Sequence, residues 1–173
     1  YNAGQRIFGE NKIQEMTDKW EVMPKDIEWH MIGHVQTNKV KYMAPYVSLI
    51  HGVDSLKLLQ EINKQAAKNN RVIDCLLQMY IAEEESKFGL DEQELEEILS
   101  STEFKQLKNI RIVGLMGMAT FTEDKNQIEK EFKHLKTIFD KFTIHNSQFT
   151  ILSMGMSGDY QLAISCGSTM VRI

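Results

Sequence analysis

The sequence predicts an α/β protein built as a (β/α)₈ barrel. Short apolar runs of strand type alternate with helical patterns along the chain, and polar or glycine residues follow nearly every run. No run is followed by the G-x-G-x-x-G turn of many open, doubly wound sheets. Barrels take their site residues from the loops after all strands, whereas open sheets concentrate them at one point, so these observations favour the barrel over the open sheet.

Seven apolar runs have the composition of strands. They are residues 6–8, 28–32, 47–53, 72–81, 111–118, 149–154 and 169–173. Strands that alternate with helices form parallel sheets with right-handed crossovers. A (β/α)₈ barrel has eight βα units, so seven strands indicate one unit fewer. The 173 residues also fall below the usual length of such a barrel.

Six segments between these runs show helical periodicity. The clearest is 124–142, where Ile128, Phe132 and further apolar residues recur at three- and four-residue steps and would bury one face. Serine or acidic residues near the starts of 55–69 and 91–101 suit helix capping. The remaining helical segments are 11–20, 37–44 and 158–166.

Composition indicates one globular domain over residues 1–173. Hydrophobic residues make up 42% of the chain and charged residues 25%, which is enough apolar mass for a core. A formal net charge of −4 argues against a nucleic-acid-binding face. The apolar stretches are too short or too glycine-broken to cross a membrane, and the start lacks a signal-peptide pattern. We therefore expect a cytoplasmic protein that binds neither nucleic acid nor membrane. We also expect the protein to be a monomer.

The cysteines and the closely spaced histidines do not predict a redox or metal site. Cys75 lies in a strand-like run and Cys166 ends a helical pattern, with no second cysteine near either, so we expect both to be buried packing residues. His30 and His34 are four residues apart, a metal-ligand spacing on a helix. Gly33 and the strand pattern around it argue against a helix there.

The chain carries five distinctive motifs: FGENKIQE, WHMIGHVQTNK, LLQMYIAEEESKFGL, GLMGMA and LSMGMSGDYQLAISCGSTMVRI. Their sequence and order resemble the pyridoxal phosphate homeostasis protein family, and the resemblance runs from Tyr1 to Ile173. It implies a barrel of the alanine racemase N-terminal type, here lacking the first βα unit, that holds pyridoxal 5'-phosphate (PLP) in its mouth. It also implies a role in intracellular PLP and vitamin B6 homeostasis, in which the protein holds the cofactor or delivers it to PLP-dependent enzymes without established catalysis.

The last motif has the order strand, glycine and hydroxyl, short helix, hydroxyl, strand, which suits a phosphate cradle. Ser157 and the backbone amides at the start of helix 158–166 would face the anion, and Gly155 would let the backbone approach it. From the residues alone, a helix-capping role for Ser157 is equally supported; the resemblance favours the phosphate. Ser168 and Thr169 would add donors from the neighbouring loop, beside the strands where barrels commonly bind phosphate.

Four further residues complete the site that the resemblance implies. Arg172 would donate a hydrogen bond to the pyridine nitrogen of PLP, and because arginine stays protonated it would not supply a proton. The alternative for Arg172 is an ion pair at the barrel rim. Asn11 would bond the phenolic oxygen of PLP, while His34 and Met154 would line the walls of the site.

The PLP-bearing lysine of the family lies upstream of the FGEN motif, and no residue of this sequence matches it. The family pattern also continues past Ile173 with a glycine. We therefore expect both ends of the chain to be cut back, and the residues present to lack a covalent PLP anchor. Lys87 follows three glutamates, a setting that does not favour the unprotonated amine that such an anchor needs.

A PLP-dependent, racemase-like enzyme is the alternative to a PLP carrier. It would need a second acid–base group on the far face of the cofactor, and the nearest candidates are His34, Tyr80 and Tyr160. A third alternative is an interaction scaffold, in which replacing Ser157 would leave the biological effect unchanged.

Overall fold

The computed structural model describes residues 1–83, 88–144 and 146–173. Its centre is one sheet of seven strands, and each strand overlaps one of the seven predicted runs. The strands are β1 (Ile7–Glu10), β2 (Glu28–Met31), β3 (Leu49–Val53), β4 (Ile73–Met79), β5 (Ile110–Gly117), β6 (Ile151–Met156) and β7 (Met170–Arg172).

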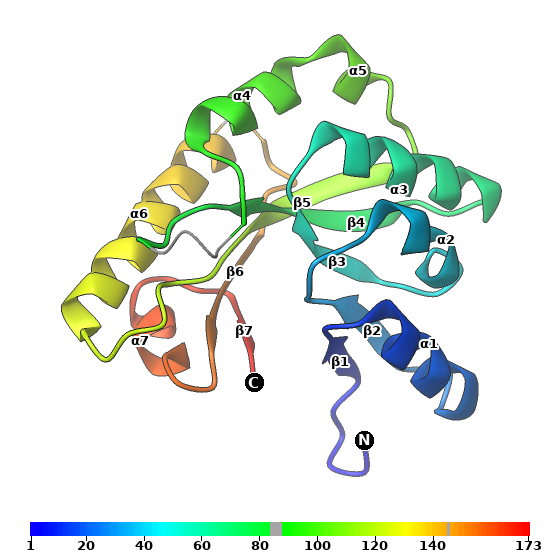
Figure 1. The fold of residues 1–173 in the computed structure, drawn as a ribbon, viewed down its shortest axis with the longest axis horizontal. Helices are drawn as coiled ribbons and strands as arrows, with labels where there is room; N and C mark the ends of the chain where they lie inside the picture. Colours follow the sequence, from blue (N-terminus) through cyan, green and yellow to red (C-terminus); the bar gives the residue numbers. More distant parts are fainter. Residues whose placement is uncertain (84–87, 145) are drawn as a thin grey trace.

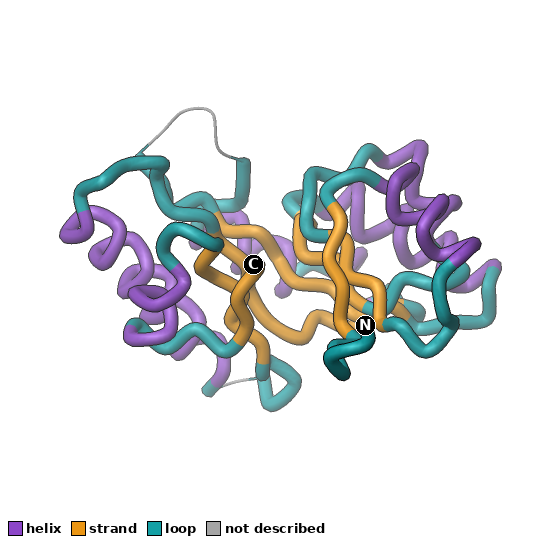
Figure 2. Tube along the Cα trace, turned by 90° about the horizontal axis from the view of Figure 1, so that it is seen from below, coloured by secondary structure: helices purple, strands orange, loops and turns teal. Residues whose placement is uncertain are grey.

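The sheet curls into a nearly closed barrel with the helices on its outer face (Figures 1 and 2). Spatial neighbours follow chain order from β1 to β7, and every neighbouring pair is parallel. A doubly wound sheet would reverse its strand order at a switch point, and this sheet does not. The structure therefore confirms a (β/α)₈-type barrel with one unit fewer, in which β1 and β7 are the two edges.

The helices cover the barrel in the order that the sequence predicts, with two differences. The pattern at 37–44 divides into a 3₁₀ turn and a short α-helix, and α5 was not predicted because four residues show no clear period. The helical elements are α1 (Ile13–Val22), η1 (Thr37–Lys39), α2 (Val40–Met43), α3 (Leu56–Lys68), α4 (Glu92–Ser100), α5 (Thr102–Lys105), α6 (Lys125–Thr143) and α7 (Tyr160–Ser165).

Side chains near the starts of α3, α4 and α6 satisfy backbone amides that have no partner within the helix. Ser55 accepts from Leu58 N at the start of α3, and Asp124 accepts from two amides at the start of α6. Asp91 and Glu94 form a reciprocal capping box at the start of α4. Local sequence signals of this kind explain why the predicted and observed helix starts agree closely.

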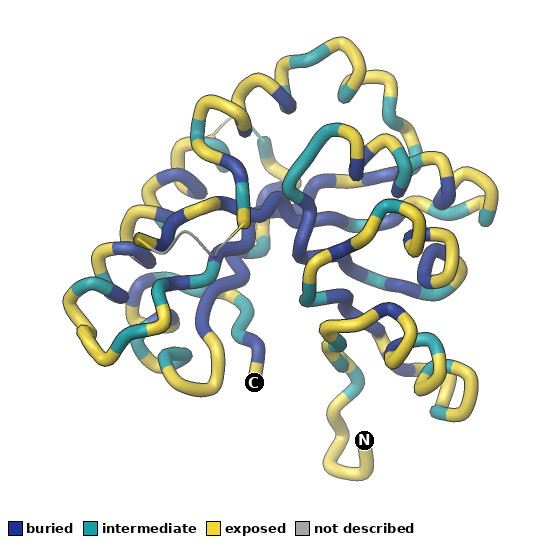
Figure 3. The backbone as a smooth tube through the Cα atoms, in the orientation of Figure 1, coloured by how far each residue is buried: buried dark blue, intermediate teal, exposed yellow. Residues whose placement is uncertain are grey.

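Apolar side chains form two clusters, one on each face of the sheet. The larger cluster lies between the sheet and the helices and includes Trp29, Phe132 and Cys75. The smaller cluster lies inside the barrel, and its buried members are Leu49, Leu76, Val113 and Met116. Figure 3 shows the central strands mostly buried and the outer helix faces exposed, whereas the edge strand β1 has no buried residue. Both cysteines are buried and unpaired, as predicted, and burial raises the pKa of the Cys75 thiol.

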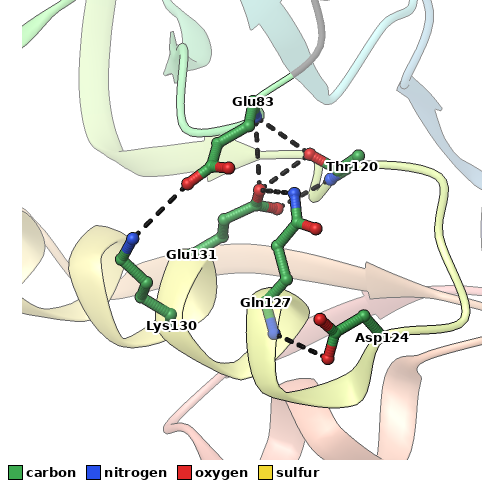
Figure 4. A network of polar contacts seen from close by, with 6 residues as sticks. All are labelled: Glu83, Thr120, Asp124, Gln127, Lys130 and Glu131. Atoms are coloured by element: carbon green, nitrogen blue, oxygen red, sulfur yellow. Dashed lines mark hydrogen bonds and ion pairs between the residues drawn. The ribbon is translucent and has the colours of Figure 1, made fainter.

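A buried carboxylate ties the loops after β4 and β5 to α6. Glu131 of α6 is 4% exposed and accepts hydrogen bonds from the backbone N–H of Thr120 (2.7 Å), the hydroxyl of Thr120 (2.7 Å) and the backbone N–H of Glu83 (3.2 Å). The Gln127 amide adds a fourth donor at 3.2 Å (Figure 4). One side chain therefore fixes two loops at the carboxyl end of the barrel, where sites of this fold lie.

Two further features bear on the class of protein. None of the helices in the described ranges is both long enough and apolar enough to cross a membrane. Among the same residues, no three histidine, cysteine, aspartate or glutamate side chains gather where they could hold a metal ion.

Candidate functional site in the open barrel

A cleft of about 470 Å³ lies between the edge strands β1 and β7, where the eighth strand of a closed (β/α)₈ barrel would lie. Residues from β1 form one wall and residues from β7 the other, while His30 of β2 and His51 of β3 lie on its floor. The full lining comprises Gln5, Ile7, Phe8, Gly9, His30, Ile32, His51, Met170, Val171, Arg172 and Ile173. Polar side chains of the barrel interior therefore line this gap.

A continuous line of hydrogen bonds crosses the barrel interior behind this cleft. Arg172 Nη1 donates to Ser153 Oγ at 2.6 Å, and Arg172 Nη2 donates to the Gly117 carbonyl at 3.1 Å. His51 Nδ1 lies 3.0 Å from Ser153 Oγ, and His51 Nε2 lies 3.1 Å from His30 Nδ1. The line joins β2, β3, β6 and β7 and reaches the β5 backbone at Gly117.

Burial decides the charge of each group in this line. Burial lowers the pKa of His30 to about 4, so this ring is neutral at pH 7. Burial also holds the pKa of His51 well below its ordinary value, and the neighbouring His30 and Arg172 lower it further. Burial lowers the pKa of Arg172 to about 10, which leaves the guanidinium protonated. Arg172 is therefore the one charged member of the line.

Arg172 is 8% exposed and lines the cleft, so the structure places it inside the barrel and not at its rim. It forms no ion pair within the described ranges, and the predicted alternative of a rim ion pair is not observed. A guanidinium carries five N–H donors, and the two hydrogen bonds to Ser153 and Gly117 leave three of them for a ligand.

Ser157 lies in the turn between β6 and α7 and is exposed, beside a pocket of about 520 Å³. The N-cap residue of α7 is Asp159, whose carboxylate accepts from Met156 N at 2.6 Å. Ser157 makes no hydrogen bond to the described residues, so its predicted alternative role as a helix cap is not observed. Gly155 of β6 has a φ of +98°, and a Cβ there would lie 2.5 Å from the Ala163 Cβ, so the close packing of β6 against α7 requires glycine.

The structure separates Ser168 and Thr169 from Ser157, which corrects the expectation that they lie together. Both residues precede β7 and therefore lie toward the amino ends of these parallel strands, whereas Ser157 follows the carboxyl end of β6. The Ser168 hydroxyl lies 2.7 Å from the Met154 carbonyl, and Thr169 Oγ1 accepts from Leu152 N at 2.8 Å. These hydroxyls tie β7 to β6.

Met154 faces the helices and not the cleft, which corrects its placement on the wall of the site. It is fully buried and belongs to the same apolar cluster as Leu152, Phe132 and Ala163. Side chains alternate along a strand, and the intervening Ser153 faces the barrel interior. An inward Ser153 therefore requires an outward Met154.

Asn11 and His34 meet at a separate pocket of about 360 Å³, after the carboxyl ends of β1 and β2. A Cβ at Gly33 would lie 2.2 Å from the Asn11 carbonyl oxygen, so glycine permits this close approach of the two loops. The His34 ring stacks on Phe88 with centroids 5.2 Å apart. This pocket shares no lining residue with the cleft.

The candidates for a second acid–base group do not come together. His34 lines the pocket with Asn11, and Tyr160 lines the pocket with Ser157. Tyr80 lines none of the pockets named above. Lys87 lies outside the described residues.

Sequence reasoning missed His51 and Ser153 and considered His30 only as a metal ligand. All three lie in apolar strand runs. A single polar residue in such a run does not change the prediction of a buried strand, so it gives no sign of a functional role. The signal that could have found them is alternation: Leu49 and His51 share one face of β3, and Leu49 belongs to the cluster inside the barrel.

Comparison with known proteins gives the same fold and a family. The family model "Alanine racemase, N-terminal domain" matches residues 1–173. Proteins named "Pyridoxal phosphate homeostasis protein" are 40% identical in Aquifex aeolicus and 41% identical in Helicobacter pylori. The matches cover the whole of this chain and 76% and 77% of those proteins, respectively.

Solved structures extend the comparison to three dimensions. PipY of Synechococcus elongatus PCC7942 is 32% identical both without PLP (TM-score 0.89) and with PLP bound (TM-score 0.86), with 99% of this chain and 81% of that chain covered. An alanine racemase of Clostridium difficile shares the fold at 12% identity and a TM-score of 0.75, over 99% of this chain and 44% of that chain. By these full-length matches, the chain belongs to the alanine racemase N-terminal domain family and, within it, to the pyridoxal phosphate homeostasis proteins.

Proposed function

We propose that this protein binds PLP in the open barrel and serves PLP homeostasis by holding or delivering the cofactor. The observation that carries the proposal is Arg172, a buried guanidinium whose remaining donors are available at a cleft inside the barrel. The structure determined with PLP bound to PipY, a relative 32% identical over 99% of this chain, supports the assignment of the ligand.

The residues at the cleft fit a ligand with a ring acceptor. A guanidinium fixed by Ser153 and Gly117 donates to an unprotonated ring nitrogen and holds its own proton at neutral pH. Ser157, exposed and without a partner in the described ranges, would contribute a donor to the phosphate. Asn11 and His34 line a pocket separate from the cleft, so we do not place them at the phenolic oxygen of a ligand bound to Arg172. PLP, when bound, supplies an electron-withdrawing ring and an aldehyde that reacts with amines.

The arrangement of acid–base groups favours a holder over an enzyme. Racemase-like chemistry needs a matched acid and base on opposite faces of the reacting carbon. His34 and Tyr160 line different pockets, and His30 and His51 are neutral rings already bonded to each other. An amino-acid racemase remains the second candidate because the fold is shared with alanine racemases. Deuterium exchange at the α-carbon of an amino acid distinguishes the two.

Binding of PLP is tested by equilibrium dialysis of the full-length protein. We expect saturable binding, and we expect Arg172→Ala to weaken it by about tenfold or more because a charged hydrogen bond is lost. Arg111→Ala is the matched control, since Arg111 lies on β5 and forms an exposed ion pair with Asp74. Unchanged PLP affinity in Arg172→Ala, with an unchanged circular dichroism spectrum, contradicts the proposal.

The cellular part of the proposal is delivery of PLP by a cytoplasmic monomer to PLP-dependent enzymes. The names of the relatives support a role in PLP homeostasis, within which delivery to enzymes is our proposal. Activation of a PLP-requiring apoenzyme by the loaded protein, faster than by the same amount of free PLP, tests delivery. Light scattering of the same sample tests the monomer.

A further inference from the structure

A line of hydrogen bonds joins Arg172, Ser153, His51 and His30. Only one direction of these bonds gives a partner to every polar atom of the two middle members, Ser153 and His51. Arginine has donors and no acceptor, so Ser153 Oγ accepts from Arg172 Nη1. Ser153 is fully buried, and His51 Nδ1 at 3.0 Å is its one other side-chain partner in the described part of the chain. The Ser153 hydroxyl proton must therefore point to His51 Nδ1, because otherwise it would be buried without an acceptor.

This direction fixes the tautomer of both histidines. His51 accepts at Nδ1, so its proton is on Nε2, and Nε2 donates to His30 Nδ1 at 3.1 Å. His30 then accepts at Nδ1 and carries its own proton on Nε2. His30 lines the cleft, and none of the described residues hydrogen-bonds to its Nε2. The low pKa values of both rings are consistent with neutral tautomers at pH 7.

We propose that Ser153 and His51 are positioning residues that hold His30 as a fixed hydrogen-bond donor, so that the cleft recognises its ligand through two donors, the Arg172 guanidinium and His30 Nε2–H. This inference rests on the proposed function for the identity of the ligand. It adds a prediction of ligand specificity, called the selection rule below. The ligand atom that faces His30 is a hydrogen-bond acceptor, such as a phenolate, carbonyl or carboxylate oxygen. A protonated amine at that position would meet a donor and bind less tightly.

Nitrogen-15 NMR of histidine-labelled full-length protein tests the tautomers without any ligand. We expect His51 and His30 to show a protonated Nε2 and an unprotonated Nδ1 at pH 7. The exposed His134 of α6 serves as the internal reference for a solvated ring. A protonated Nδ1 on His51 or His30 overturns the inference.

Ser153→Ala tests the positioning role, and Ser153→Thr is the conservative variant that keeps the hydroxyl. In Ser153→Ala we expect His51 to lose its single tautomer and PLP affinity to fall by about tenfold, because Arg172 and His51 lose their shared partner. In Ser153→Thr we expect the wild-type tautomers and a loss of less than about threefold. Wild-type tautomers in a folded Ser153→Ala protein contradict the positioning role.

Addition of PLP separates this inference from the proposed function. We expect the His30 Nε2–H resonance to move when PLP binds, while His134 stays in place. PLP binding without any shift of His30 overturns the selection rule and leaves the proposed function standing. Predicted tautomers with no PLP binding at all contradict the proposed function and the ligand assignment, and support the direction of the hydrogen bonds.

Discussion

Arg172 on the edge strand β7 donates a 2.6 Å hydrogen bond to Ser153 on β6, inside the barrel. The same guanidinium bonds the Gly117 carbonyl of β5 and lines the cleft between β1 and β7. One side chain therefore contributes both to the assembly of the barrel and to the binding of a ligand. Its replacement has to be analysed for both effects.

Arg172→Lys keeps the positive charge and removes the planar fork. A lysine ammonium cannot reach the Ser153 hydroxyl and the Gly117 carbonyl while also facing a ring acceptor in the cleft. We expect PLP affinity to fall by about tenfold with a small loss of stability, measured by equilibrium dialysis and thermal unfolding. Arg111→Lys on β5 is the control. Wild-type PLP affinity in Arg172→Lys would show that a positive charge at position 172 is sufficient for PLP binding.

Acidification should destabilise the protein through the buried histidines. The folded-state pKa of His30 is about 4, below the ordinary value of 6.5, so the unfolded chain binds a proton first as the pH falls. The contribution of neutral His30 to the free energy of unfolding is therefore complete above pH 6.5. It is lost progressively between about pH 6.5 and 4, by on the order of 3 kcal/mol. Urea unfolding across this range measures the slope.

His30→Gln and His51→Gln should each flatten this pH dependence, because each removes one group that the folded state keeps neutral. His134→Gln is the control, since His134 is exposed on α6. A wild-type slope in both buried variants would show that other groups cause the acid sensitivity.

Ser157→Ala should separate binding from stability. Ser157 is exposed and makes no hydrogen bond to the described residues, so we expect the free energy of unfolding to change by less than about 0.5 kcal/mol. PLP affinity should fall by about threefold to tenfold if the hydroxyl donates to the phosphate. Ser165→Ala on α7 loses one exposed bond to the Leu162 carbonyl and serves as the control. Equal PLP affinity in the two variants contradicts the role of Ser157.

Glu131→Gln should loosen two loops at the carboxyl end of the barrel. The amide nitrogen of glutamine would face a donor, because both carboxylate oxygens accept hydrogen bonds from Glu83, Thr120 and Gln127 (Figure 4). We expect a loss on the order of 2 kcal/mol in the free energy of unfolding. Hydrogen exchange at the amide of Thr120 should also accelerate.

The control for Glu131→Gln is Glu129→Gln, which removes one ion pair with Lys133 on the same helix. We expect that exposed pair to contribute less than about 1 kcal/mol. Equal stability losses in the two variants would contradict the clamping role of Glu131.

The barrel could be predicted from the sequence because its signals are local. Each strand is an apolar run, and caps such as Asp91 mark where helices begin. The helix α5 and the division of residues 37–44 were missed because segments of three or four residues show no full helical period, although Ser101 caps α5. The start of α7 was placed two residues early because Asp159, and not Ser157, occupies the N-cap.

The site was predicted less completely than the fold. Its composition depends on which strand residues face the barrel interior and which face the helices. Arg172 was found from its position near the end of the last strand. The polar line behind it was missed, because His51 and Ser153 meet at 3.0 Å across 102 residues of sequence. Ser168 and Thr169 were grouped with Ser157 by nearness in sequence. Because β6 and β7 are parallel, the loop before β7 and the turn after β6 lie toward opposite ends of the sheet.

A crystal structure of the full-length protein with PLP tests the central claim most directly. The account predicts PLP in the cleft between β1 and β7, with its ring nitrogen within hydrogen-bond distance of the Arg172 guanidinium. PLP bound elsewhere, or bound in the cleft with Arg172 still paired only to Ser153 and Gly117, would contradict it.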